Sequence, residues 1–127
     1  MKHFAPAVGW SVIILILSVM PGSSLPKFGW QFSLGWDKLA HFVVYAVLAV
    51  LIGWAIQRRS NIKFSNLLCD FLVCSAYGTL LECFQHWFLV DRVFEVPDLI
   101  ANIIGSFAGT FIVHLRRGKK NILWISQ

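Results

Sequence analysis

The chain has 127 residues, of which 57% are hydrophobic and 13% are charged. Soluble domains carry about 25% charged residues, and a soluble chain this short could not bury so much apolar surface in one core. The net charge of +5 does not indicate a nucleic-acid-binding protein, because the basic residues lie at the ends of apolar segments and not along one exposed face. The composition therefore predicts a single-domain integral membrane protein.

The apolar residues form four blocks, which predict an all-α bundle of four transmembrane helices. The first block, about residues 5–20, is short for a full span and ends before Pro21. Lys2 ahead of this block is typical of a secretory signal peptide, but no small-residue cleavage site follows it. We expect an uncleaved first helix.

The other three helices are predicted at about residues 37–56, 67–90 and 98–115. Asp37 suits the first turn of the second helix, either as an N-cap or as an acid near the helix N-terminus. The tail that follows residue 115, RRGKKNILWISQ, is basic and then amphipathic, so we expect it to rest at the membrane interface. The whole chain, 1–127, forms one domain.

The basic residues predict the orientation of these helices, since cytoplasmic loops are enriched in Lys and Arg. With the N-terminus inside, eight basic residues lie inside and three outside. The inside group is Lys2, Arg58, Arg59, Lys63, Arg116, Arg117, Lys119 and Lys120, and the outside group is Lys27, Lys38 and Arg92. The bias predicts that both termini are cytoplasmic.

Polar residues of three predicted helices fall at one depth, near the outer face. Within each segment they recur every three or four residues, which places them on one face of the helix. Three polar helix faces at one level indicate a shared pocket. The predicted binding residues are Asp37, Lys38, His41, Tyr45, Glu82, Gln85, Arg92, Asp98 and Asn102.

An ionisable group inside a bilayer costs several kcal/mol unless it is paired, neutralised or hydrated. Glu82 lies about two turns from the end of its span and needs a partner, for which Arg92, Lys38 and the histidines are candidates. We predict that Arg92 pairs with Glu82 or Asp98.

Two features have structural interpretations. Asp70 lies near the inner end of the third helix, where Arg58, Arg59 and Lys63 could pair with it. The G-x-x-x-G of residues 105–109 lets a neighbouring helix approach closely, so we expect it to serve helix packing.

The polar cluster also has structural alternatives. Asp37 and Asp98 could be helix N-caps only. His41 could simply bond Tyr45 or a backbone carbonyl, and Glu82 with Gln85 could be a polar clasp between helices.

The residues of the cluster resemble the pattern of the VanZ-like family of small bacterial membrane proteins. That pattern has D-K-x-x-H-F-x-x-Y in one helix, then E-x-x-Q, then an Arg followed by D-x-x-x-N-x-x-G entering the last helix. Here these positions are Asp37, Lys38, His41, Phe42, Tyr45, Glu82, Gln85, Arg92, Asp98, Asn102 and Gly105. Glu95 departs from the pattern. The resemblance implies a small envelope membrane protein and a link with resistance to the glycopeptide teicoplanin, but no defined reaction.

Several functions remain open. The main hypothesis is a protein of the bacterial cytoplasmic membrane that binds or modifies an anionic envelope lipid or a lipid-linked cell-wall precursor. A catalytic version would use His41 or His86 as base with Glu82 or Asp98 as its partner. A metal site of two histidines and carboxylates is an alternative, although we predict no metal and no cofactor. The last alternative is a structural partner of another envelope protein.

Overall fold

The computed structural model describes residues 2–20, 35–59, 63–89 and 94–125, and all regular secondary structure within these ranges is helical. A 3₁₀ turn, Lys2–Phe4, leads into α1 (Ala5–Val19), which is followed by α2 (Gly35–Arg59), α3 (Phe64–Phe88) and α4 (Val96–Ile125). Four helices among the described residues are long and apolar enough to cross a membrane. The predicted all-α fold with four spans is confirmed.

The helix ends differ from the prediction in two ways that matter. Helices α2 and α4 each begin two residues early, so Asp37 and Asp98 lie within the first turn and are not N-caps. The membrane-spanning part of α4, Val96–Arg116, agrees with the predicted span of about 98–115, but the helix itself continues beyond it to Ile125. The tail is rich in good helix formers, and its one glycine, Gly118, costs only about 1 kcal/mol in a helix.

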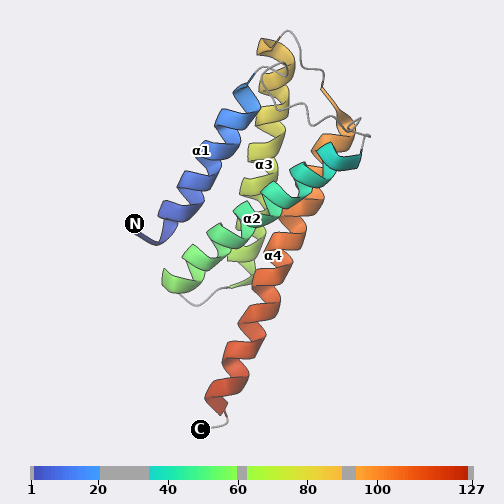
Figure 1. The fold of residues 1–127 in the computed structure, drawn as a ribbon. Coiled ribbons are helices and arrows are strands. Elements are labelled where there is room, and N and C mark those ends of the chain that lie inside the picture. Colours follow the sequence, from blue (N-terminus) through green and yellow to red (C-terminus); the bar gives the residue numbers. More distant parts are fainter. Residues whose placement is uncertain (1, 21–34, 60–62, 90–93, 126–127) are drawn as a thin grey trace.

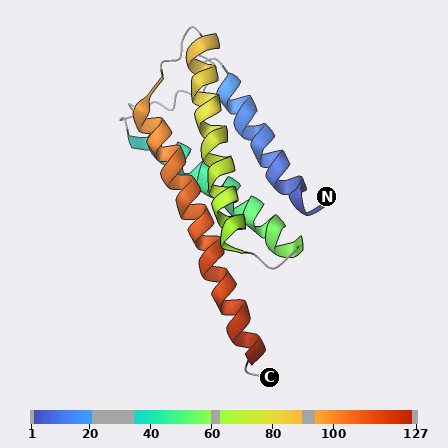
Figure 2. The ribbon, with the colours of Figure 1, turned by 180° about the vertical axis from the view of Figure 1, so that it is seen from behind.

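Helix α2 lies across one side of α3 and α4, with α1 beside α3 at the edge of the bundle (Figures 1 and 2). The contact between α2 and α4 is very close at two glycines. The carbonyl oxygens of Phe42 and Ala46 occupy the space that a Cβ atom would need at Gly105 and Gly109. The prediction that this glycine pair serves helix packing is confirmed.

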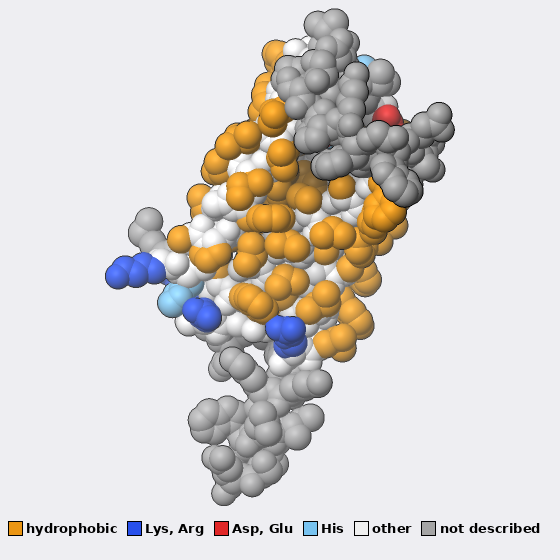
Figure 3. Space-filling model, in the orientation of Figure 1, with side chains coloured by type: hydrophobic (Ala, Val, Ile, Leu, Met, Phe, Trp, Pro, Cys, Tyr) orange, Lys and Arg blue, Asp and Glu red, His pale blue; other side chains and the backbone are white. Residues whose placement is uncertain are grey.

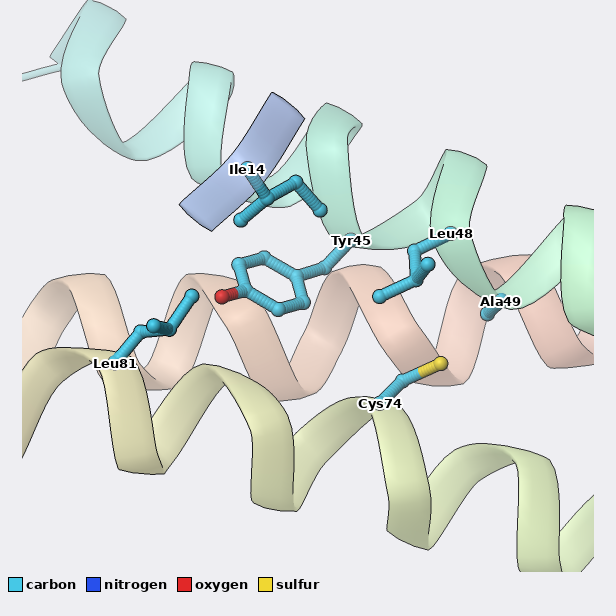
Figure 4. Packing of buried hydrophobic residues seen from close by; sticks show 6 residues of the cluster. All are labelled: Ile14, Tyr45, Leu48, Ala49, Cys74 and Leu81. Carbon is cyan, nitrogen blue, oxygen red and sulfur yellow. The ribbon is translucent and has the colours of Figure 1, made fainter. Parts of the chain in front are cut away.

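The core joins α1, α2 and α3 in the middle of the bundle. Figure 4 shows Tyr45 of α2 lying between Ile14 of α1 and Leu81 of α3. Hydrogen bonds from side chains to backbone carbonyls also join these helices. Trp10 Nε1 donates to the Val44 carbonyl at 3.0 Å, which ties α1 to α2.

Asp70 is buried between α3 and α4, with only 2% of its surface exposed. Cys74 Sγ lies 3.6 Å from Oδ1 and Thr110 Oγ1 lies 3.5 Å from Oδ2, and both act as donors. The exposed side chains of residues 58, 59 and 63 form no ion pair with Asp70 in the described part of the chain. The prediction of basic partners for Asp70 is wrong, because the carboxylate faces α4 instead of the loop.

The face of the bundle that Figure 3 shows is largely covered by hydrophobic side chains. Large residues such as Leu80 and Phe107 are exposed by 67% and 60%, as expected of surfaces that face lipid. Charged side chains lie toward the two ends. We name the end where α2 and α4 begin the Asp37 end. The chain termini lie toward the opposite end, together with Lys2, Arg58, Arg59, Lys63 and Arg116.

Candidate functional site: a histidine–carboxylate cluster at the Asp37 end

His41 of α2 is the centre of a polar cluster that three helices build. Its Nδ1 atom lies 3.0 Å from Asn102 Oδ1 of α4 and 3.7 Å from Glu82 Oε1 of α3. Its Nε2 atom lies 3.8 Å from Asp98 Oδ2 of α4 and 4.0 Å from Asp37 Oδ1 of α2. Four of the predicted site residues therefore lie around the imidazole ring of a fifth, His41.

Helix periodicity and helix crossing together produce this arrangement. Asp37 and His41 are four residues apart on α2, as Asp98 and Asn102 are on α4, so each pair shares one helix face. The close approach at Gly105, three residues after Asn102, presses these two faces against each other. The first-turn positions of Asp37 and Asp98 also suit their charge, because a helix N-terminus stabilises a carboxylate.

Among the residues that the structure describes, Lys38 brings a positive charge to the cluster. Its Nζ atom lies 3.2 Å from Asp98 Oδ1 and 3.2 Å from Glu95 Oε2. Arg92, the partner predicted from the sequence, lies outside the described residues. Glu95 was not predicted as part of the site, although its position three residues before Asp98 places it near the same helix end.

Asn102 holds the ring of His41 in place. The amide oxygen can only accept a hydrogen bond, so in this arrangement His41 Nδ1 carries a proton and donates it to Asn102. Asn102 is completely buried, and its own backbone carbonyl accepts a bond from Ser106 Oγ at 2.8 Å. Its amide nitrogen has no hydrogen-bond partner among the described residues.

Three further predicted residues have different surroundings. Gln85 Nε2 donates to the Ser18 carbonyl at 3.0 Å, which joins α3 to a free carbonyl in the last turn of α1. Tyr45 belongs to the apolar core and is 3% exposed. His86 is exposed on α3, with its ring 6.2 Å from that of Phe94, and the structure does not bring it to His41.

A cavity of about 200 Å³ opens beside the cluster. Helices α1, α2 and α3 all contribute to it, and its lining mixes polar with apolar side chains. Its lining is Ile14, Leu17, Ser18, Asp37, Ala40, His41, Val44, Tyr45 and Gln85. Three larger cavities, of about 450, 400 and 460 Å³, are lined mostly by apolar side chains, and none of them contains His41.

These observations define a small multi-pass membrane protein with a histidine–carboxylate cluster at one end of its helices. The sequence pattern of the VanZ/LLP1 family matches residues 3–117, a range that contains every residue of the cluster, and the chain belongs to this family.

The chain is also similar to an uncharacterized protein of the fission yeast Schizosaccharomyces pombe, with 30% identity over 89 residues. The alignment covers 66% of this chain and 52% of the relative, so the chain spans about half the length of the curated relative that it matches. No solved structure matches the chain.

Proposed function

We propose that the chain binds the head group of an anionic envelope lipid, or of a lipid-linked cell-wall precursor, in the cavity beside His41. The observation that carries this proposal is the mixed lining of that cavity. Polar side chains such as Asp37, His41 and Gln85 line it together with apolar side chains of membrane-spanning helices, among them Ile14 and Leu17 of α1. Such a lining suits an amphiphilic molecule, whose polar and apolar parts need different surroundings.

The size of the cavity supports a head group and not a whole lipid. Pockets that enclose a complete small ligand hold roughly 300–1,000 Å³, whereas this cavity holds about 200 Å³. The head group would fill it, and the acyl or prenyl chains would lie along the apolar sides of the bundle.

The hydrogen-bonding groups of the cluster suit a head group that carries both phosphate and hydroxyls. An ammonium group has three donors, and Lys38 directs its ammonium toward two carboxylates, Glu95 and Asp98. Lys38 does not line the cavity itself but follows Asp37, which does, so its ammonium could donate to a phosphate oxygen of a head group that extends beyond the cavity. The half-exposed carboxylate of Asp37 could accept a bond from a glycerol or sugar hydroxyl.

Binding is favoured over catalysis because no nucleophile is paired with His41 among the described residues. Ser18 lines the cavity, but no hydrogen bond joins its hydroxyl to the imidazole in the described structure. A catalytic function would need His41 to activate water, with Asp98 or Glu82 as its charged partner.

The proposal includes the predicted location in the bacterial cytoplasmic membrane, with the Asp37 end outside. A lipid-linked cell-wall precursor displayed at the outer surface would then reach the cavity. A link with teicoplanin resistance follows from the family resemblance, and it is tested separately by the teicoplanin sensitivity of cells with and without the chain.

The binding proposal is tested with purified full-length protein in detergent micelles. Fluorescent phosphatidylglycerol is the probe, and unlabelled lipids compete for it. Phosphatidylglycerol and a polyprenyl phosphate should compete at least tenfold better than phosphatidylcholine and the phosphate-free polyprenol. His41→Ala should weaken probe binding by up to about tenfold, because Nε2 can accept a bond from a glycerol hydroxyl of the head group and a neutral hydrogen bond contributes about 0.5–1.5 kcal/mol.

The matched control is His114→Ala, which removes an exposed histidine on α4 away from the cluster and should leave binding unchanged. Equal competition by all four lipids would refute a head-group site. If His41→Ala binds the probe as the wild type does, the cluster is a structural clasp and the alternative of a structural partner protein replaces this proposal.

A further inference from the structure

Three potential metal ligands meet where α2 and α4 begin. One ligand atom each from Asp37, His41 and Asp98 lies within 4.8 Å of the other two. A cation among them would be roughly 2.5 Å from each atom, and a contraction of a few tenths of an ångström would bring it to the usual 2.0–2.2 Å of zinc–nitrogen and zinc–oxygen bonds. We propose that these three residues bind a divalent transition-metal cation such as Zn²⁺ or Mn²⁺.

The separations between these ligand atoms suit a shared cation. His41 Nδ1 donates to Asn102, so in the neutral ring Nε2 carries a lone pair, and this lone pair faces the two carboxylates. Three electron-rich atoms then surround one point. Distances of 3.8 and 4.0 Å are too long for hydrogen bonds, but they suit atoms that share a cation.

Neighbouring side chains hold two of these ligands in place, as is usual at metal sites. Metal-bound histidines usually donate their other ring nitrogen to a carbonyl or carboxylate, and metal-bound carboxylates are also hydrogen-bonded. Here the buried side chain of Asn102 orients His41. Lys38 forms an ion pair with Oδ1 of Asp98, while Oδ2 of the same carboxylate faces the imidazole. Lys38 therefore orients one ligand and does not occupy the proposed cation position.

Exposure and ligand type indicate how the cation would be bound. The Asp98 side chain is 9% exposed, that of His41 21% and that of Asp37 51%, so the site opens toward Asp37. Three protein ligands leave coordination positions free, as in catalytic zinc sites. An imidazole nitrogen among the ligands favours Zn²⁺ over Ca²⁺ and Mg²⁺, while the two carboxylates also suit Mn²⁺.

The metal site also gives the acidic cluster a means of binding an anion. A phosphate oxygen of the head group could take one of the free coordination positions, and this role alone rests on the proposed function. The arrangement differs from the metal alternative weighed from the sequence, since His86 is not near the three ligands and a single histidine takes part.

The test uses untagged full-length protein in detergent, stripped with a chelator and dialysed against Zn²⁺, Mn²⁺, Mg²⁺ or Ca²⁺ before elemental analysis. Wild-type protein should retain one equivalent of Zn²⁺ or Mn²⁺ and much less Mg²⁺ or Ca²⁺. His41→Ala and Asp37→Asn should bind at least tenfold more weakly. Asp37 is half exposed, so its variant reports on binding even where a buried substitution disturbs folding.

His114→Ala is the matched control and should retain the full equivalent. No retained metal in the wild type, or equal retention in His41→Ala, would overturn the metal site. Lipid competition is measured separately with and without chelator, so the proposed function is judged by its own result. If metal binds but the chelator leaves phosphatidylglycerol binding unchanged, the bridging role is refuted and the metal site stands.

Discussion

Replacing Gly105 by alanine tests the helix contact on which the cluster depends. The added methyl group would overlap the carbonyl oxygen of Phe42, which belongs to the backbone of α2. A flexible side chain could rotate away, but a backbone carbonyl in a helix cannot. The two helices must therefore separate locally by roughly 1 Å to restore ordinary van der Waals contact.

The expected loss of stability follows from two opposing effects. Overpacking typically costs 1–3 kcal/mol, and this overlap with rigid backbone belongs at the upper end of that range. Alanine has a helix propensity about 1 kcal/mol better than that of glycine. The net destabilisation should be about 1–2 kcal/mol. Because Asn102 is one turn away, the same shift would lengthen its 3.0 Å bond to His41 to roughly 4 Å, beyond hydrogen-bonding distance.

Unfolding in mixed micelles of increasing SDS content, followed by tryptophan fluorescence, measures the stability change. Gly9→Ala is the matched control, since no atom lies within 4 Å of the position that its Cβ would take. That substitution should be neutral or stabilising by up to about 1 kcal/mol. Equal stability of Gly105→Ala and wild type, together with unchanged lipid and metal binding, would refute the close contact between α2 and α4.

The same unfolding assay tests three further contacts. Asp70→Asn keeps an acceptor but removes a buried charge, so its stability should equal or exceed that of the wild type, whereas Asp70→Ala should lose about 1–3 kcal/mol by leaving its donors unpaired. Gln85→Ala should lose about 1 kcal/mol with the bond to the Ser18 carbonyl, and a stability equal to that of His114→Ala would contradict this. Lys38→Gln should destabilise the chain by leaving Asp98 without its cation, and adding Asp98→Asn should recover part of the loss; purely additive effects would contradict the pairing. Reporter fusions at the two termini should both prove cytoplasmic.

The amino-acid pattern predicted the helices well because membrane insertion depends on local composition. Long apolar segments must satisfy their backbone hydrogen bonds within a helix, so four apolar blocks gave four helices. The helix ends were harder to predict. Asp98 suited an N-cap position and Asp37 either an N-cap or a first-turn position, and both lie inside a first turn. Helix α4 continues past its membrane span to Ile125, because no residue in the tail stops a helix.

The composition of the polar cluster was also largely predictable. Spacings of three and four residues assign side chains to helix faces, and these faces did converge around His41. The sequence did not show which atoms would meet. Glu95 pairs with Lys38, His86 is exposed on α3, and Asp70 bonds Thr110 of α4 instead of a nearby basic residue.

The sequence by itself determined that this chain spans a membrane and which side chains share each helix face, since both depend on composition and on the helical period. Only the tertiary structure decided that ligand atoms of Asp37, His41 and Asp98 lie within 4.8 Å of one another, whereas Gln85 bonds α1 and Tyr45 packs in the apolar core, both at the edge of the cavity beside His41. That choice depends on where α2 crosses α4, and the crossing depends on a contact at Gly105 between residues distant in the chain. Local periodicity cannot encode such a contact, because it carries no information about which helices meet or at what angle.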